Sequence, residues 1–399
     1  MADAIEVLFA FLRLGLTSFG GPIAHLGYFR EEFVVRRRWL SEESYAHTVA
    51  LCQFLPGPAS SQVGIIIGYR RAGALGALAA WCGFTLPSAF ALVAFAYGLR
   101  LVPGAAASGY VHGLLVAAVA VVALAVASMA SSLAPDRVRR TLAVTVAIGA
   151  LLAPANGYAQ LALIALGAIF GWRFLRAPAD KAVPIAQHEP EAESGDARVG
   201  LACALAFALL VIGLPFAERF VRFGPFVAFA KFFEVGALVF GGGHVVLPLL
   251  QAQVVPPGWI SNESFIAGYG AAQAVPGPLF TFAAYLGAAM ERGPVHGIGG
   301  AALTLVAIFL PSFLLVAAVL PFWERLRRNA AARAVLRGVN AAVVGVLLAA
   351  LYSPVWVSAI RSTLDVALAL GAFAALGTWR APPWSVVLGS ALLCGLLEH

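Results

Sequence analysis

Two Pro-Gly-Pro triplets interrupt apolar stretches of the chain, at Pro56-Gly57-Pro58 and at Pro276-Gly277-Pro278. Proline breaks a helix because it has no amide hydrogen and clashes with the preceding turn. Backbone groups freed at membrane depth are tolerated only where they are buried in protein or face a wet cavity. The helix that follows such a break points its amides and the positive end of its dipole into that space. Together with the glycine pairs Gly20-Gly21 and Gly241-Gly242, these breaks predict a cage for a tetrahedral oxyanion.

Hydroxyl and amide side chains follow or precede each break and add donors to the predicted cage. Simple kinks for close helix packing are the alternative, since Gly and Pro are frequent in membrane helices. The symmetry of the breaks favours the site. The predicted substrate-binding residues are Arg13, Gly20, Gly21, Pro22, Gln53, Pro56, Gly57, Pro58, Ser60, Ser61, Gly241, Gly242, Gly243, Gln273, Pro276, Gly277, Pro278 and Thr281.

Charged residues inside apolar segments cost about 2.5 to 3.5 kcal/mol each on insertion scales and need a reason to be there. Arg13 is the predicted counter-charge for the anion, and Glu234 or His244 the predicted carrier of a coupled proton. Snorkelling to an interface is the alternative for Arg13 and the favoured explanation for Lys231. Four other histidines are weak candidates because they are not at matching repeat positions: His25, His47, His112 and His296. No catalytic residue, metal site or cofactor is predicted.

The motifs occur twice in the same order, about 220 residues apart. Phe19-Gly20-Gly21 returns as Phe240-Gly241-Gly242, and Ser41 with Glu43 as Ser261 with Glu263. Gln53 ahead of the first Pro-Gly-Pro matches Gln273, and Leu86-Pro87-Ser88 matches Leu310-Pro311-Ser312. A collinear series of this kind indicates a duplication. In an apolar chain, two repeats are typical of a transporter with a central site.

The composition predicts a polytopic α-helical membrane protein. Apolar residues make up 61% of the 399 positions and charged residues only 11%, against about 45 to 50% and 25% in soluble domains. The net charge of +7 comes from arginines clustered between apolar runs. Such clusters are typical of the cytoplasmic loops of membrane proteins, so the positive charge does not indicate a nucleic-acid partner. The long apolar runs are 72–99, 108–133, 141–170, 199–217, 297–322 and 338–360.

The duplication divides the chain into a first half, 1–176, and a second half, 199–399, joined by a polar segment, 177–198, that is predicted to be a disordered cytoplasmic linker. Matching loops differ in arginine content. Residues 28–44 hold four arginines and 248–264 none, whereas 100–112 hold one and 323–337 five. Because cytoplasmic loops retain positive charge, the halves are predicted to be inverted in the membrane. The extra apolar segment 199–217 supplies the odd crossing.

Arginines at both ends of 42–69 indicate that this stretch enters and leaves the membrane on one side. Residues 4–38 are expected to do the same, which gives two re-entrant hairpins and four crossings per half. Complete but broken crossings remain the competing arrangement. The N-terminus and linker are predicted to be cytoplasmic and the C-terminus periplasmic, in a bacterial inner membrane.

The motif-bearing segments resemble the chromate ion transporter family, of the two-domain (long-chain) type. The resemblance runs through Leu14–Pro22, Arg37–Glu43, Leu51–Gly64 and Gly83–Ser88, and continues in the second half over Val239–Pro248 and Gln273–Pro278. It implies chromate efflux that confers resistance, coupling to the proton motive force, and sulfate as a look-alike substrate. The second half departs from the pattern at Gly243-His244, where the first half has Pro22-Ile23.

Three questions stay open at this point. Sulfate uptake or anion exchange by the same cage is an alternative to chromate efflux, and an intramembrane enzyme acting on lipid phosphate is an alternative of another class. A nucleotide-driven pump is excluded within this chain because neither of its two lysines follows a glycine, as a P-loop requires. The expected partners are a small inorganic oxyanion and membrane lipid, and a homodimer is left open.

Overall fold

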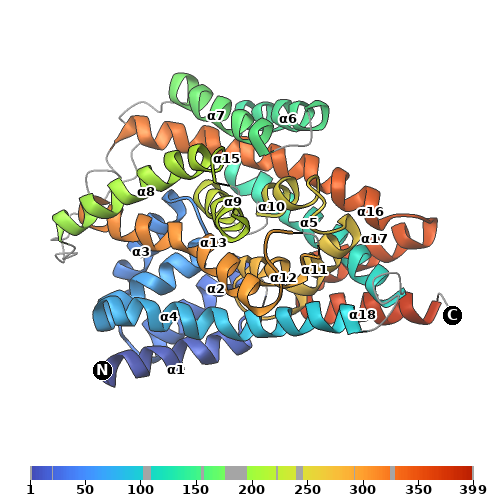
Figure 1. Cartoon of the computed structure of the whole chain (residues 1–399), viewed down its shortest axis with the longest axis horizontal. Coiled ribbons are helices and arrows are strands. Elements are labelled where there is room, and N and C mark those ends of the chain that lie inside the picture. The colour runs from blue at the N-terminus through green and yellow to red at the C-terminus, as the bar shows by residue number, and fades with distance from the viewer. Residues whose placement is uncertain are drawn as a thin grey trace.

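The computed structural model describes residues 2–19, 21–101, 109–153, 157–175, 196–221, 223–239, 246–291, 293–323 and 329–397. Helices connected by short loops account for nearly all of these residues, and the described ranges contain no strand. The fold is therefore all-α, as the composition predicts. Figure 1 shows α1 and α4 side by side at one edge and α6 and α7 at the opposite edge.

The order of elements is the same in both halves. The first half holds α1 (Ala2–Thr17), α2 (Gly21–Arg30), η1 (Glu31–Arg36), α3 (Glu42–Phe54), α4 (Ala59–Leu101), α5 (Gly109–Leu133), α6 (Arg137–Leu152) and α7 (Gly157–Phe174). The second half holds α9 (Gly224–Leu238), α10 (Val246–Val254), α11 (Asn262–Ala274), η5 (Leu279–Thr281), α12 (Phe282–Ala289), α13 (Gly297–Val319), η6 (Leu320–Phe322), α15 (Ala330–Ala350), η7 (Leu351–Trp356), α16 (Val357–Ala359), α17 (Thr363–Gly377) and α18 (Pro383–Leu397). The unmatched helix is α8 (Ala197–Ala217).

Equivalent helices start with equivalent caps. Ser41 precedes α3, and its hydroxyl accepts a hydrogen bond of 3.1 Å from the Ser44 amide. Ser261 precedes α11 and accepts the same 3.1 Å bond from the Ser264 amide. A serine in this position satisfies an amide that has no partner within the helix. The repeated serines of the sequence are therefore helix starts, which places both Pro-Gly-Pro triplets one helix later.

Helix α4 is two helices joined by a sharp turn. Ala72 and Gly73 leave the helical region, and Gly73 has a φ of +59°, a conformation that favours glycine. The arms on either side pack closely, since a Cβ on Gly68 would lie 2.3 Å from the Gly76 carbonyl oxygen. The segment 59–71 is thus a separate arm, and the apolar run 72–99 forms the second arm.

In the first half, the two ends of each broken segment lie close together. The Arg70 guanidinium, at the end of the first α4 arm, donates a 2.5 Å hydrogen bond to the Ser44 hydroxyl at the start of α3. Arg37, after η1, donates a 2.9 Å bond to Glu6 near the start of α1. Both contacts join the two ends of one segment, as a hairpin requires.

The second half repeats the contacts of the Pro-Gly-Pro hairpin, formed by α11 and α12, at a different place in the molecule. The Tyr285 hydroxyl, in α12, donates to the Ser264 carbonyl at the start of α11, 2.8 Å away. The Glu291 amide donates to the Trp259 carbonyl at 3.3 Å. These ends lie beside the far end of α4, where Arg100 donates a 3.0 Å bond to the Met290 carbonyl. The second arm of α4 therefore separates the ends of the first-half hairpins from those of the second half.

The central helices α5 and α15 each pack against the outer helices of the other half. Helix α15 lies along α6 and α7, and α5 lies along α17 and α18. Small residues permit the approach: a Cβ on Gly171 would lie 2.4 Å from the Ala334 carbonyl oxygen, and one on Gly113 would lie 2.3 Å from the Ser390 carbonyl oxygen. Backbones this close are typical of helix pairs in membranes. The two halves are interlocked in space.

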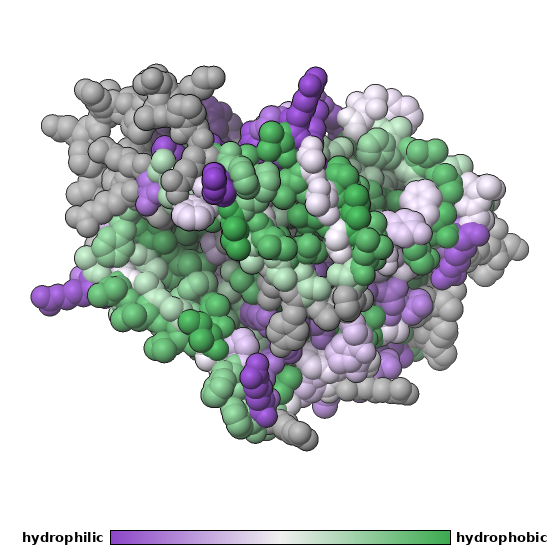
Figure 2. Space-filling view, turned by 90° about the horizontal axis from the view of Figure 1, so that it is seen from above, coloured by the Kyte–Doolittle hydropathy of each residue, from purple (hydrophilic) through white to green (hydrophobic). Residues whose placement is uncertain are grey.

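The outer surface is broadly apolar. In the described chain five helices are long and apolar enough to cross a membrane: α4, α5, α8, α13 extended through η6, and α15 extended through α16. Helix α8 leaves large apolar side chains such as Leu209 and Ile212 more than 70% exposed. Figure 2 shows wide hydrophobic areas on one face. This surface suits lipid rather than water, so the protein is a multi-pass membrane protein. The apolar run 141–170 divides into α6 and α7.

The predicted linker falls mostly outside the described residues. Its last residues, however, belong to the second half, because Asp196 caps α8 and accepts a 2.9 Å hydrogen bond from the Arg198 amide. Helix α8 consequently begins at Ala197, two residues before the predicted boundary at 199.

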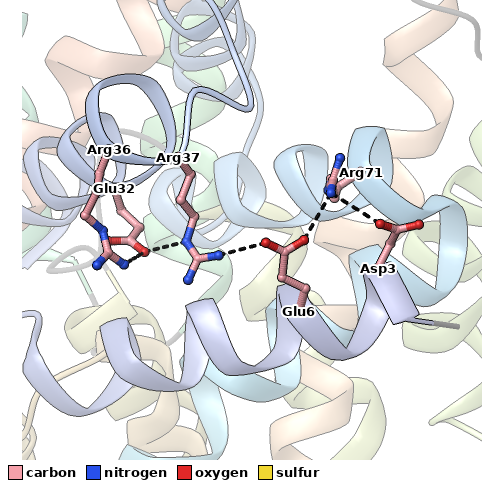
Figure 3. A network of polar contacts seen from close by, with 6 residues as sticks. All are labelled: Asp3, Glu6, Glu32, Arg36, Arg37 and Arg71. Atoms are coloured by element: carbon pink, nitrogen blue, oxygen red, sulfur yellow. Dashed lines mark hydrogen bonds and ion pairs between the residues drawn. The ribbon is translucent and has the colours of Figure 1, made fainter.

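A chain of ion pairs joins the ends of the first-half hairpins (Figure 3). Glu32 is buried and accepts hydrogen bonds from Arg36 and Arg37, and Arg37 also reaches Glu6. Arg71, at the turn of α4, pairs with Glu6 at 3.0 Å and with Asp3 at 3.3 Å. The guanidinium groups of Arg37 and Arg71 both stack on the Trp39 ring, 5.2 and 5.3 Å from its centroid. This network ties α1, η1 and α4 together.

Replacing Glu32 with Gln is expected to lower the free energy of unfolding at neutral pH by about 1 to 2 kcal/mol. Burial raises the pKa of the Glu32 carboxyl, but the hydrogen bonds from Arg36 and Arg37 outweigh it and leave the pKa below its ordinary value. A depressed carboxyl pKa stabilises the fold above the unfolded value and loses that effect as pH falls through the folded value. Thermal unfolding in detergent should therefore show a wild-type advantage at pH 7 that shrinks in acid. Glu31→Gln, at an exposed neighbour, is the matched control, and equal losses in both variants would contradict the prediction.

Candidate anion site

The two Pro-Gly-Pro loops each bond to the backbone of the other half. Gly57 has a φ of +117°, and Gly277 a φ of +103°, values that L side chains rarely adopt. The Gly57 amide donates to the Val239 carbonyl at 2.6 Å, and the Gly277 amide donates to the Ser18 carbonyl at 3.0 Å. Ser18 and Val239 are equivalent residues, directly before the Phe-Gly-Gly motifs. Reciprocal contacts of this kind are what a two-fold relation between the halves produces.

Each loop also lies against the Leu-Pro-Ser motif of the other half. A Cβ on Gly57 would lie 2.8 Å from the Ser312 hydroxyl of α13, and a Cβ on Gly277 would lie 2.8 Å from the Ser88 hydroxyl of α4. The added Cβ on Gly277 would also lie 3.1 Å from the Phe84 carbonyl oxygen. Three of the four repeated motifs therefore meet in pairs across the interface between the halves.

Around these loops the described protein leaves several buried polar atoms without a hydrogen-bond partner. Gln62 is fully buried; its amide nitrogen donates to the Pro56 carbonyl at 2.6 Å, while its Oε1 has no partner. The other such atoms in this region are Ser18 Oγ, His25 Nε2, Ser61 Oγ, Thr85 Oγ1, Gln273 Nε2 and Ser312 Oγ. Buried polar groups are nearly always satisfied, so a cluster of exceptions indicates bound water or a ligand.

The helices that follow the loops bring backbone donors to the same region. In α4 the first helical bond runs from the Gln62 amide to the Pro58 carbonyl, at 3.0 Å. The amides of residues 59–61 come before it and have no acceptor within the helix. In the second half the Thr281 amide donates to the Pro278 carbonyl at 3.0 Å. The amides of residues 279–280 come before it and likewise have no acceptor within the helix. Helix N-termini of this kind attract anions.

His25, on α2, is part of this cluster although it has no counterpart in the second half. It is buried, its Nδ1 lies 3.3 Å from the Ser60 hydroxyl, and its ring contacts Phe84 edge-on with centroids 5.1 Å apart. Val246 occupies the equivalent position in α10. The two halves therefore supply different side chains to a backbone arrangement that is shared.

The structure places the remaining predicted residues unevenly. Ser60, Ser61, Gly57 and Pro58 are buried at the first loop, and Pro278 and Thr281 at the second. The Thr281 hydroxyl donates a hydrogen bond of 2.7 Å to the Pro278 carbonyl. Pro56, Gln273, Pro276 and Gly277 are partly buried, as are Gly21 and Pro22 at the start of α2. Gln53 is exposed and is not part of the buried cluster.

Two expectations from the sequence need correction. The amides of Gly57 and Gly277 are not free donors, because each is already bonded to a carbonyl of the other half; they hold the halves together. Arg13 lies on the exposed face of α1 and makes no side-chain hydrogen bond among the described residues. The structure therefore does not place it as the counter-charge of the buried cluster.

Of the proton-coupling candidates, only Glu234 is described. It is partly buried on α9. Its neighbour Lys231 pairs with Glu218, at the end of α8, with the nitrogen and oxygen 3.0 Å apart. Lys231 therefore forms an ion pair within the protein. The snorkelling expected from the sequence would not require such a partner. His244, Gly20, Gly241, Gly242 and Gly243 lie outside the described residues.

The sequence analysis did not include Ser18, Thr85, Ser88 and Ser312 among its candidates and rated His25 a weak one, whereas the structure places all five beside the two loops. Ser88 and Ser312 carry a signal, because they end a repeated Leu-Pro-Ser motif. Thr85 lies one turn before Ser88 and belongs to the same motif region. His25 and Ser18 carry no repeat signal, since Val246 and Val239 replace them in the second half.

The fold and the site define a class: an α-helical multi-pass membrane protein, built from duplicated broken helices whose breaks meet around unsatisfied donors. A family model described as "Chromate transporter" matches residues 5–172 and 226–396, one copy in each half. The chain belongs to the chromate transporter family.

Curated relatives extend over nearly the whole chain. A chromate transport protein of Pseudomonas aeruginosa is 30% identical over 386 residues, covering 94% of this chain and 87% of that protein. A chromate transport protein of Cupriavidus metallidurans is 26% identical, covering 99% and 93%. A probable chromate transport protein of Synechococcus elongatus is 26% identical, covering 85% and 81%. No solved structure matches this chain.

Proposed function

We propose that this chain is a secondary transporter that moves chromate out of the cell and thereby confers resistance. The family assignment supports the substrate class. The observation that carries the site is the cluster of unpartnered polar atoms beside Gly57 and Gly277. A tetrahedral dianion has four oxygens that accept hydrogen bonds, and the cluster offers serine and threonine hydroxyls, a glutamine amide and helix N-terminal amides.

A cage of mostly neutral donors suits a ligand that must also leave. Buried hydrogen bonds to a charged ligand contribute about 1.5 to 3 kcal/mol each, so several suffice for binding without a fixed cation. Sulfate has the same charge and shape as chromate, and the same donors would hold it. Transport of sulfate is therefore the second outcome that the transport assay must separate.

The membrane potential can drive export of such an anion. A potential that is negative inside is worth about 2.3 kcal/mol per charge for each 100 mV. A departing dianion gains about twice that, which sustains a gradient on the order of a thousandfold. Exchange for protons would add to this driving force.

We infer that the halves are inverted about an axis in the membrane plane and that their broken segments are re-entrant hairpins. Three observations support this. The ends of both first-half hairpins and of the α11–α12 hairpin contact each other, the two sets of ends lie at opposite ends of the second α4 arm, and arginines concentrate at the first set. The anion site would then lie between the two hairpin tips, near the middle of the bilayer.

Cysteine labelling in intact cells tests this topology. In a background without the four native cysteines, Arg37→Cys is expected to resist a membrane-impermeant reagent, and Pro257→Cys, in an exposed loop of the second half, is expected to react. Permeabilised cells should label both. Reaction of both positions from outside would contradict the inversion.

Transport into everted membrane vesicles tests the function directly. Vesicles that contain the protein should accumulate labelled chromate, faster when a potential or pH gradient is imposed than when both are abolished. Labelled sulfate in the same vesicles shows whether the cage also carries that ion. If the vesicles took up sulfate but showed no protein-dependent chromate uptake, sulfate would be the substrate and the proposal of chromate would be wrong.

A further inference from the structure

A pocket away from the Pro-Gly-Pro loops contains a buried histidine and aspartate from different halves. His112 is in the first turn of α5, and Asp365 is in the first turn of α17. Arg361, Ser362 and Cys394 line the same pocket. His112 and Asp365 are only 6% and 5% exposed. Two ionisable groups buried together in a membrane protein mark a functional site.

The hydrogen bonds of Asp365 define which histidine nitrogen carries the proton. One carboxylate oxygen, Oδ2, accepts from the amides of Arg361 and Ser362 at 2.9 Å and from the Ser362 hydroxyl at 3.1 Å. The other, Oδ1, lies 2.8 Å from His112 Nε2. A carboxylate that accepts all these bonds makes Nε2 the donor, so a neutral His112 has its lone pair on Nδ1. Nδ1 is buried and has no partner in the described protein.

We propose that His112 is the proton-carrying residue of this transporter, with Asp365 as its fixed counter-charge; this rests on the proposed function. A hydronium ion gives up one O–H bond and becomes water as its proton adds to the Nδ1 lone pair and forms one N–H bond, and the carboxylate of Asp365 balances the imidazolium charge. Release breaks the same bond and returns the proton to water.

The position of the pair explains how the proton could act on transport. The bond joins α5 of the first half to α17 of the second, two helices that pack together. Charging the imidazole strengthens the bond between the halves, and discharging it weakens that bond. Movement of one half against the other is the usual basis of alternating access in repeat transporters. A proton on His112 would thus bias the arrangement of the halves.

The other charged or titratable groups around the pocket are few. Arg361 comes from the segment before α17, Asp365 from α17 itself and Cys394 from α18. Among the described residues, the neighbouring α11, α15, η7 and α16 contribute nothing to the pocket lining. Arg361 is exposed, so solvent screens its charge. Asp365 is therefore the group with the strongest influence on His112.

Purified protein in liposomes provides the test, with the variant His112→Gln compared against wild type and against His296→Gln, an exposed histidine. Chromate counterflow at equal pH on both sides should stay within about twofold in His112→Gln. The acceleration by an imposed pH gradient should disappear in His112→Gln and persist in His296→Gln. A His112→Gln protein that responds to the gradient like wild type would overturn the proposal.

A second variant covers the case in which His112→Gln does not fold. Asp365→Asn removes the counter-charge and is expected to shift the pH profile of wild-type transport to more acid pH, because the imidazolium loses its stabilising partner. A purely structural role would lower the rate at every pH, and an unshifted profile would therefore reject the proposal. Failure of wild-type counterflow with chromate would instead reject the proposed function, and this inference with it.

Discussion

Gly57→Ala is expected to reduce the initial rate of chromate transport at least tenfold while the protein still inserts in the membrane. The backbone at Gly57 has a φ of +117°, which costs a residue with a side chain about 1 to 3 kcal/mol. The added Cβ would also lie 2.6 Å from Gln62 Nε2 and 2.8 Å from Ser312 Oγ. To relieve these contacts the loop must move, which breaks its bond to the Val239 carbonyl. Transport in vesicles, normalised to protein in the membrane, measures the effect.

The duplication supplies a second test of the same kind and good controls. Gly277→Ala, with a φ of +103° and a Cβ 2.8 Å from Ser88 Oγ, should be impaired to a similar degree. Gly98→Ala and Gly371→Ala lie in helices with nothing within 4 Å of the added Cβ and should transport normally. Normal transport by Gly57→Ala and Gly277→Ala would show that the loops do not need this geometry.

Ser312→Ala is expected to weaken chromate binding about tenfold, and Ser88→Ala by less than about threefold. The Ser312 hydroxyl is buried without a partner in the described protein, so it can donate a hydrogen bond to a bound oxyanion. The loss of one such bond costs about 1.5 kcal/mol or more. The equivalent Ser88 hydroxyl already donates to the Thr85 carbonyl at 3.0 Å. Its removal takes a bond from the helix, not from the ligand.

This comparison controls for packing, because Ser312 beside Gly57 and Ser88 beside Gly277 occupy equivalent places in the two halves. The measurement is the apparent KM for chromate and the concentration of sulfate that halves chromate uptake. We expect Ser312→Ala to raise both. Equal effects of the two substitutions, or no effect of Ser312→Ala, would show that the unpartnered hydroxyl does not face the substrate.

The sequence was sufficient to predict the helical membrane fold, the order of motifs in the two halves and the meeting of the halves at their breaks. These follow from composition and from the spacing of Gly, Pro and Ser, which act on the backbone locally. It was also sufficient to predict that the two ends of 42–69 lie close together, as the bond between Arg70 and Ser44 shows, since charge is excluded from the membrane interior. Those parts of the fold need no knowledge of tertiary contacts.

The sequence could not predict which donors are free. Gly57 and Gly277 look like anion-binding amides until their bonds to Val239 and Ser18 are seen. Arg13 looks buried because its segment is apolar, but the exposed face of α1 carries it. The pairing of His112 with Asp365 joins residues 253 positions apart, and only the packing of α5 on α17 brings them together.

The central claim is that both halves build one anion site around their Pro-Gly-Pro loops. A structure determined with bound chromate, in which chromium is located by its density or anomalous signal, tests this claim most directly. We predict a single chromate ion whose oxygens accept hydrogen bonds from Ser312 Oγ, Gln273 Nε2 and the first amides of α4. Chromium bound instead at Arg13, in the His112 pocket or at one half alone would contradict the claim.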